Sequence, residues 1–153
     1  MTVETIRIAA VLYVLSVAAW LTRRDPLARI TWSIACAFYL AHVVAAFQSV
    51  HHWSHTAAYL ETARQTAQVF AIDWGGGLYF NYLFTVIWIA DALYWWQAGL
   101  LKYRNRRWIG ATVHYFMAFI FFNATVVFAT GPTRWLGLAA TCALLAIASR
   151  NRS

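Results

Sequence analysis

The sequence predicts an all-α, polytopic membrane protein with about five transmembrane helices and one interfacial amphipathic helix on the outer side. Hydrophobic residues make up 62% of its 153 residues, against roughly 45–50% in soluble domains, and charged residues make up only 11%. The apolar residues occur in runs long enough to cross a bilayer, and basic residues gather between these runs. Because a chain this apolar cannot hide its surface from water, we expect one integral membrane domain over residues 1–153.

Five apolar runs are the predicted spans. Pro26 follows the first run at a position that a helix cannot easily cross. Three glycines at positions 75–77 break the chain before the third run, and Gly131-Pro132 makes a turn after the fourth. The residues from 102 to 107 form a basic loop, and the last run is short for a hydrocarbon core of roughly 30 Å. The predicted spans cover residues 6–21, 30–50, 75–98, 108–130 and 135–148.

An amphipathic helix is predicted at residues 54–72, between the second and third spans. Its polar and apolar residues recur at spacings of three and four, which is the helical period, and Ser54 is a suitable N-cap. A helix of this kind lies in the membrane interface; the alternative is an extramembrane helix packed on the bundle. The polar face consists of Glu61, Arg64, Gln65 and Gln68, and the apolar face of Tyr59, Leu60, Ala63, Ala67, Phe70 and Ala71.

The basic residues predict the orientation. If the spans alternate, nine of the twelve basic residues lie on one side, and the positive-inside rule places that side in the cytoplasm. The N-terminus is then outside and the C-terminus inside, and we expect the inner membrane of a bacterium. The cytoplasmic set is Arg23, Arg24, Arg29, Lys102, Arg104, Arg106, Arg107, Arg150 and Arg152, and the outer set is Arg7, Arg64 and Arg134.

The tryptophans support the same arrangement. Eight of the nine fall near predicted span boundaries, where indole rings favour the membrane interface and form an aromatic belt. Trp88 is the exception, because it lies in the middle of the third span. The inner boundaries carry Trp20, Trp32, Trp95, Trp96 and Trp108, and the outer boundaries carry Trp53, Trp74 and Trp135.

Several function classes are disfavoured. The net charge of +7 does not indicate nucleic-acid binding, because the basic residues occupy short segments between spans instead of one surface. Cys36 and Cys142 each lie inside an apolar run, which favours packing over a disulfide framework or a zinc site. The chain has no G-x-S-x-G elbow, phosphate-binding glycine loop or H-E-x-x-H motif, so we do not expect an enzyme that acts as an isolated chain.

Three ionisable residues fall inside the predicted spans: His42, Asp91 and His114. An aspartate at the centre of a span costs roughly 2.5–3.5 kcal/mol on insertion scales, so such residues normally face protein or water. Their depths allow all three to meet in one layer. Asp91 belongs to a seam with heptad spacing, which predicts a packed helix face. The seam consists of Gly77, Asn81, Phe84, Trp88, Asp91, Trp95 and Ala98.

We expect Asp91 to form a hydrogen bond with His42 or His114. The pair would serve a proton relay, a quinone pocket or a haem site; the structural alternative is a polar pair that only fixes helix packing. A haem bound by both histidines requires them at the same depth on facing helices. Haem and quinone are less expected cofactors than a transition metal. The candidate cofactor-binding residues are His42, Trp88, Asp91 and His114.

The stretch His-His-Trp-Ser-His at residues 51–55 is the densest group of metal-ligand side chains in the chain. On a continuing helix, the first and third or the second and third histidine would share one face. Neutral imidazoles suit zinc, copper, iron or nickel, and Glu61 or Asp73 could add an oxygen ligand. The alternative is that the histidines only anchor a helix end at the interface. The candidate metal ligands are His51, His52 and His55.

The His-His-x-x-His pattern of residues 51–55 resembles the histidine boxes of membrane fatty acid desaturases and hydroxylases. The resemblance covers these five residues and implies a di-iron centre. In those enzymes several such boxes lie on the cytoplasmic side, whereas this chain has five histidines in total and its cluster is predicted outside. A complete di-iron site is therefore not expected, and no family is assigned.

Two functions agree with these features. One is a cofactor- or metal-associated subunit of a larger, redox-linked membrane assembly. The other is a self-associating transporter or channel for protons or metal ions. Its entrance would be His51, His52 and His55, and its path would be His42, Asp91 and His114. Both functions imply partners within the bilayer, either other membrane subunits or further copies of this chain.

Overall fold

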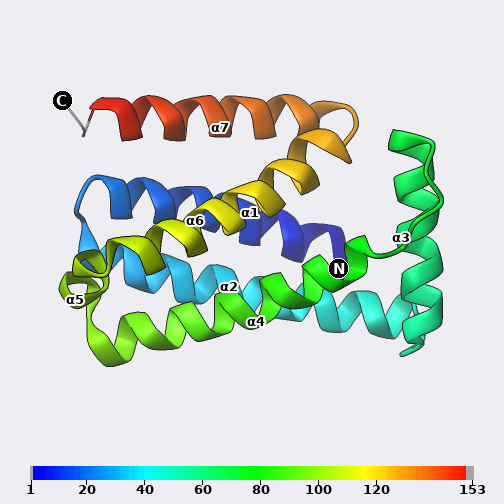
Figure 1. The fold of residues 1–153 in the computed structure, drawn as a ribbon, viewed down its shortest axis with the longest axis horizontal. Helices are drawn as coiled ribbons and strands as arrows, with labels where there is room; N and C mark the ends of the chain where they lie inside the picture. Colours follow the sequence, from blue (N-terminus) through cyan, green and yellow to red (C-terminus); the bar gives the residue numbers. More distant parts are fainter. Residues whose placement is uncertain (1, 151–153) are drawn as a thin grey trace.

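The computed structural model describes residues 2–150 and contains no strand in that part of the chain. Its long helices run back and forth, while α3 stands across one end of them and α5 lies at the other (Figure 1). These are named here the α3 end and the α5 end. The elements are α1 (Thr2–Leu21), α2 (Asp25–Ser49), α3 (His55–Phe70), α4 (Gly77–Ala98), α5 (Leu100–Asn105), α6 (Arg107–Phe122), the π-helical segment η1 (Asn123–Val127) and α7 (Pro132–Arg150).

Four helical stretches are long and apolar enough to cross a membrane. Helix α4 has 22 residues, which is roughly 33 Å at 1.5 Å per residue, but it is not one of the four. Large apolar side chains such as Val11, Val44 and Leu145 are exposed, which suits contact with lipid. The predicted all-α membrane fold is confirmed. The four stretches are Val3–Leu21, Asp25–Ser49, Arg107–Val127 and Pro132–Arg150.

Three boundaries differ from the predictions. Helix α2 begins at Asp25, so that Pro26 lies in its first turn. Backbone N–H groups in the first turn have no acceptor within the helix, so a proline there costs no hydrogen bond. Helix α7 has 19 residues and is long enough to span, in contrast to the short run that was predicted. The predicted basic loop is largely helical, because it contains α5.

Helix α3 is the predicted amphipathic helix. The Ser54 hydroxyl accepts a hydrogen bond from the Ala57 N–H at 3.2 Å, which confirms the predicted N-cap. Small side chains form its buried face. After α3 the chain approaches this helix closely at Gly75, where an added Cβ would collide with the backbone carbonyl of Tyr59. The buried residues of α3 are Ala58, Ala63 and Thr66.

The two predicted groups of basic residues lie at opposite ends of the bundle. Each long helix begins at the end where the previous one stops (Figure 1). The larger group lies at the α5 end, except Arg152, which is outside the described residues. The smaller group, Arg7, Arg64 and Arg134, lies at the α3 end. The separation of charge is therefore confirmed, and the assignment of one end to the cytoplasm stays a prediction.

Aromatic rings fill the centre of the bundle. Trp32 and Trp95 stack with 5.2 Å between ring centroids and are 0% and 1% exposed. The prediction that these two rings mark the membrane interface is wrong, because the α4 seam turns inward against α2. Trp108, by contrast, is 88% exposed. The predicted seam is confirmed at its buried members, Phe84, Trp88, Asp91 and Trp95.

Candidate functional site

The three clustered histidines have separate surroundings. Helix α2 ends at Ser49, and the chain turns before α3, with positive φ angles of 48° at His52 and 59° at Trp53. The helical spacing that would aim two histidines at one ion is therefore lost. His51 packs against Phe47 at 5.4 Å, and His55 packs against two tyrosines of α4 at 5.9 Å, between ring centroids.

The predicted metal site is not shown within residues 2–150, and metal binding by these histidines stays a prediction. In this part of the chain, no three His, Cys, Asp or Glu side chains approach closely enough to hold a metal ion. Asp73 is exposed. Glu61 instead accepts hydrogen bonds from Arg64 at 2.6 and 2.9 Å and from Gln65 at 2.9 Å. The physical reason is the turn, which separates the histidines before they can converge.

A cavity of about 490 Å³ opens at the α3 end, between α1, α2, α3, α4 and α6. It is named here the α3-end cavity. Aromatic rings line its deeper part: Tyr39 stacks on Trp88 at 5.3 Å, and Phe84 meets Trp88 edge-on at 5.2 Å. Tyr13 and Phe121, stacked at 4.6 Å, also line it. The predicted cofactor residues His42 and Trp88 therefore share one cavity.

The polar wall of this cavity has donors that the protein does not use. The Thr85 hydroxyl donates to the Asn81 carbonyl at 2.8 Å. The Tyr39 hydroxyl lies 3.1 Å from the Thr85 oxygen and is the donor of that pair. Among residues 2–150, the Asn81 side-chain amide and the Tyr82 hydroxyl form no hydrogen bond. Both line the cavity, so both can bind a ligand oxygen.

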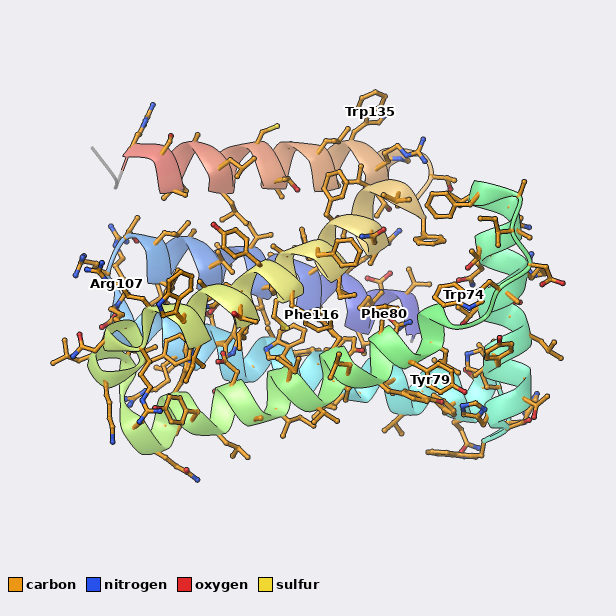
Figure 2. All side chains as sticks on the ribbon, in the orientation of Figure 1. Trp74, Tyr79, Phe80, Arg107, Phe116 and Trp135 are labelled. Atoms are coloured by element: carbon orange, nitrogen blue, oxygen red, sulfur yellow. The ribbon has the colours of Figure 1, made fainter. Side chains whose placement is uncertain are left out.

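The mouth of the cavity lies under α3. Glu61, Gln65, His51 and Arg7 line it. Hydrogen bonds from Arg64 lower the pKa of Glu61 to about 2, so this carboxylate is ionised at neutral pH. The polar face of α3 thus turns partly toward the cavity, while apolar Leu60 and Phe70 are exposed. Tyr79 lies beside α3 at the start of α4 (Figure 2).

A second group of polar side chains lies deeper in the bundle. Asp91 is only 5% exposed, and its Oδ2 has no hydrogen-bond partner. The indoles of Trp32 and Trp95 and the Tyr103 hydroxyl interact with this carboxylate, but none of their donors reaches hydrogen-bond geometry with any partner. With His114, whose ring contacts Trp32 at 5.8 Å between centroids, these residues are named here the Asp91 cluster.

The predicted bond between Asp91 and a histidine is wrong for His114, because both of its ring nitrogens lack a partner. Its ring packs instead on Trp20, with 4.3 Å between centroids. Tyr39 of α2 lies opposite Thr85 of α4, because their side-chain oxygens are 3.1 Å apart. His42 is three residues further along α2, toward the α3 end. Asp91 is roughly 9 Å further along α4 than Thr85, at about 1.5 Å per residue.

The predicted common layer of three ionisable residues is therefore not formed. His42 belongs to the α3-end cavity, whereas Asp91 and His114 belong to the Asp91 cluster. A haem held by both histidines is also excluded, because its axial ligands must lie at one depth. The cause is helix register: the ring of His114 on α6 contacts Trp32 of α2, and His42 lies ten residues, roughly 15 Å, further along α2 than Trp32.

A wider groove of about 1070 Å³ lies nearer the α5 end, between α1, α5, α6 and α7. It is named here the α5-end groove. It shares Tyr13 and Phe121 with the α3-end cavity. Sequence reasoning missed the roles of Trp32 and Tyr103 in the neighbouring Asp91 cluster. The one available signal was the single tyrosine inside an otherwise basic segment.

No protein-family model, curated protein sequence or solved structure matches this chain. The candidate sites therefore rest on geometry and chemistry. The geometry divides the predicted site residues into two groups. The α3-end cavity is an open site with unused donors, and the Asp91 cluster is a buried polar centre in the aromatic core, whose Tyr103 and His114 also border the α5-end groove.

Proposed function

We propose that this protein is a membrane subunit that binds a planar, lipid-soluble molecule of the quinone class in the α3-end cavity. The observation that carries the proposal is a cavity whose deeper part is aromatic and whose wall bears two unused donors. Its volume of about 490 Å³ falls in the range of small-molecule sites, roughly 300–1,000 Å³.

The chemistry of the wall suits a quinone head. A quinone is an uncharged ring with carbonyl oxygens that accept hydrogen bonds. The Asn81 amide and the Tyr82 hydroxyl can donate to such oxygens, and the stacked Tyr39 and Trp88 rings can pack against the ligand ring. His42 lines the same cavity and supplies a further polar group. A quinone implies a redox partner, so the proposal retains the larger redox-linked assembly.

Binding of a short-chain ubiquinone analogue to the purified protein in mild detergent tests the proposal. Titration calorimetry should show one site. Asn81→Leu removes a donor and should weaken binding roughly fivefold, because one neutral hydrogen bond contributes about 1 kcal/mol. Ala46→Phe should abolish binding, since Ala46 lines the cavity. Co-purification from the native membrane would identify the redox partner.

The matched control is Val44→Phe, which adds the same ring to α2 at an exposed position. This variant should bind the analogue as the wild type does. If Ala46→Phe and Val44→Phe bind equally well, the analogue occupies another place and the proposal fails. Absence of binding to the wild type at solubility-limited concentrations would also refute it.

A second candidate function, transport, is supported by one observation. The α3-end cavity and the α5-end groove are both lined by the stacked pair Tyr13 and Phe121. Opening this pair would join them into a path. Only His51 of the three clustered histidines lines the cavity, so the entrance differs from the predicted one. Proton flux in liposomes that rises in Tyr13→Ala, and not in Val44→Ala, would favour transport.

A further inference from the structure

The α5-end groove, with its volume of about 1070 Å³, has walls of two kinds. Apolar and small side chains of the spanning helices line most of its length. At the α5 end the lining becomes basic. The apolar part includes Val17, Leu21, Ala118, Leu144, Leu145 and Ala148, and the basic part is Arg23, Arg104 and Arg107.

Helix α7 packs closely on η1 near its first turns and also contacts α1. Gly137 is the only buried residue of α7. A Cβ at this position would lie 2.7 Å from the Thr125 carbonyl, so the glycine allows α7 to approach η1 closely. Further along α7, toward Arg150, no residue is buried, and side chains of α7, α1 and α6 line the groove there.

The three arginines differ in how they are held. Arg104 donates to Asp25 at 2.6 Å and to the Trp20 carbonyl at 2.7 Å, so its position is fixed by protein. Arg23 and Arg107 form no ion pair with any residue from 2 to 150. No Asp or Glu side chain lines the groove. The basic rim therefore has two guanidinium groups available for an anion.

The start of α6 also favours an anion at this rim. Helix α6 begins at Arg107 without a side-chain cap, so its first N–H groups and its dipole add positive potential. Arg107 projects at the α5 end of the bundle (Figure 2). Deeper in the groove, roughly 10 Å along α6 from Arg107, both ring nitrogens of His114 are buried without a hydrogen-bond partner.

We propose that the α5-end groove binds a phosphate-bearing lipid of the surrounding bilayer, with its phosphate between Arg23 and Arg107 and one acyl chain between α6 and α7. Guanidinium groups bind phosphate oxygens through paired, charge-assisted hydrogen bonds. The apolar length of the groove complements an acyl chain, which a soluble anion lacks. This site does not depend on the ligand proposed for the α3-end cavity.

Native mass spectrometry of the detergent-solubilised protein with phosphatidylglycerol tests the proposal. The double variant Arg23→Gln/Arg107→Gln should bind this lipid about tenfold more weakly, because it removes two charge-assisted contacts. The control Lys102→Gln/Arg106→Gln removes the same charge at exposed positions of the same end that do not line the groove. It should bind within a factor of two of the wild type.

A second variant separates a lipid from a free anion. Ala118→Phe places a ring in the apolar part of the groove and leaves the arginines in place, so it should also weaken lipid binding about tenfold. Equal losses in the two double variants would overturn the proposal, because binding would then follow total charge. Unchanged binding in Ala118→Phe, together with displacement by inorganic phosphate, would overturn it in favour of a free anion.

Discussion

At the α3 end, three histidines that are neighbours in sequence lie in separate surroundings, whereas deeper in the bundle five side chains from four helices meet. The Asp91 cluster joins residues from position 32 to position 114. The histidine stretch spans only residues 51–55 and brings no metal site together. Candidate ligand residues that are close together in the sequence therefore meet in space only if one uninterrupted helix carries them on the same face.

The same comparison separates two uses of polar groups. The polar residues at the α3 end border an open cavity, where water or a ligand can act as their hydrogen-bond partner. Those of the Asp91 cluster pack against indoles, and the Asp91 Oδ2, the Tyr103 hydroxyl and both ring nitrogens of His114 have no hydrogen-bond partner in the described part of the chain. We expect substitutions in the cluster to change folding stability, and substitutions in the cavity to change binding.

The largest expected effect is at the centre of the aromatic core. Trp32→Ala should lower the free energy of unfolding by about 3 kcal/mol or more, since a fully buried ring leaves a cavity. Trp108→Ala, at an exposed ring, should change it by less than about 0.5 kcal/mol. Denaturant unfolding in micelles measures both. Similar losses in the two variants would mean that Trp32 is not the core residue described above.

A smaller effect is expected at Asp91. Asp91→Leu should cost about 2 kcal/mol, because it removes the acceptor that faces three buried donors. Asp91→Asn keeps one acceptor oxygen and should cost about half as much. The same unfolding measurement applies, with helical content as the check on folding. A leucine variant as stable as the wild type would show that the carboxylate does not organise the cluster.

The smallest effect is expected at the α3 end. The folded-state pKa of Glu61, lowered to about 2 by Arg64, lies below the value of about 4.3 in an unfolded chain. Its contribution to stability is therefore present above about pH 4.3 and lost as the pH falls toward 2. Because Arg64 is exposed, the contribution should be small.

Melting curves of the wild type and Glu61→Gln between pH 7 and pH 2.5 measure this contribution. The wild type should lose a small additional amount of stability over the acidic part of the range, and the difference between the two proteins should shrink there. Arg7→Gln serves as a control for loss of a charge at the same end. A stability difference between the two proteins that grows on acidification would contradict the ion pair between Glu61 and Arg64.

Prediction from sequence succeeded for features that depend on the residue spacing within a single helix. The α3 helix and its Ser54 cap, the glycine break before α4 and the inward seam of α4 all follow from local spacing. It failed at Trp32 and Trp95, because position near a span end does not say whether a ring faces lipid or protein. Pro26 misled for a related reason, since it is as compatible with a first turn as with a break.

The site residues show the same limit. Both His42 and Trp88 were predicted as ligand-binding residues, and they do line one cavity. Asp91 was correctly placed against other helices, but its neighbours are indoles and a tyrosine instead of a histidine. Relative depth depends on how far one helix slides along another, and a slide of one turn is about 5.4 Å.

The sequence by itself determined the membrane class, the order of the helices and the separation of basic residues between two ends, because hydropathy, charge and helical period are properties of the linear chain. Only the tertiary structure decided which polar groups meet. The turn after Ser49 separated the three histidines, and the register of α2 on α4 brought Trp32, rather than His42, to Asp91. Both depend on packing between helices, which no single stretch of sequence contains.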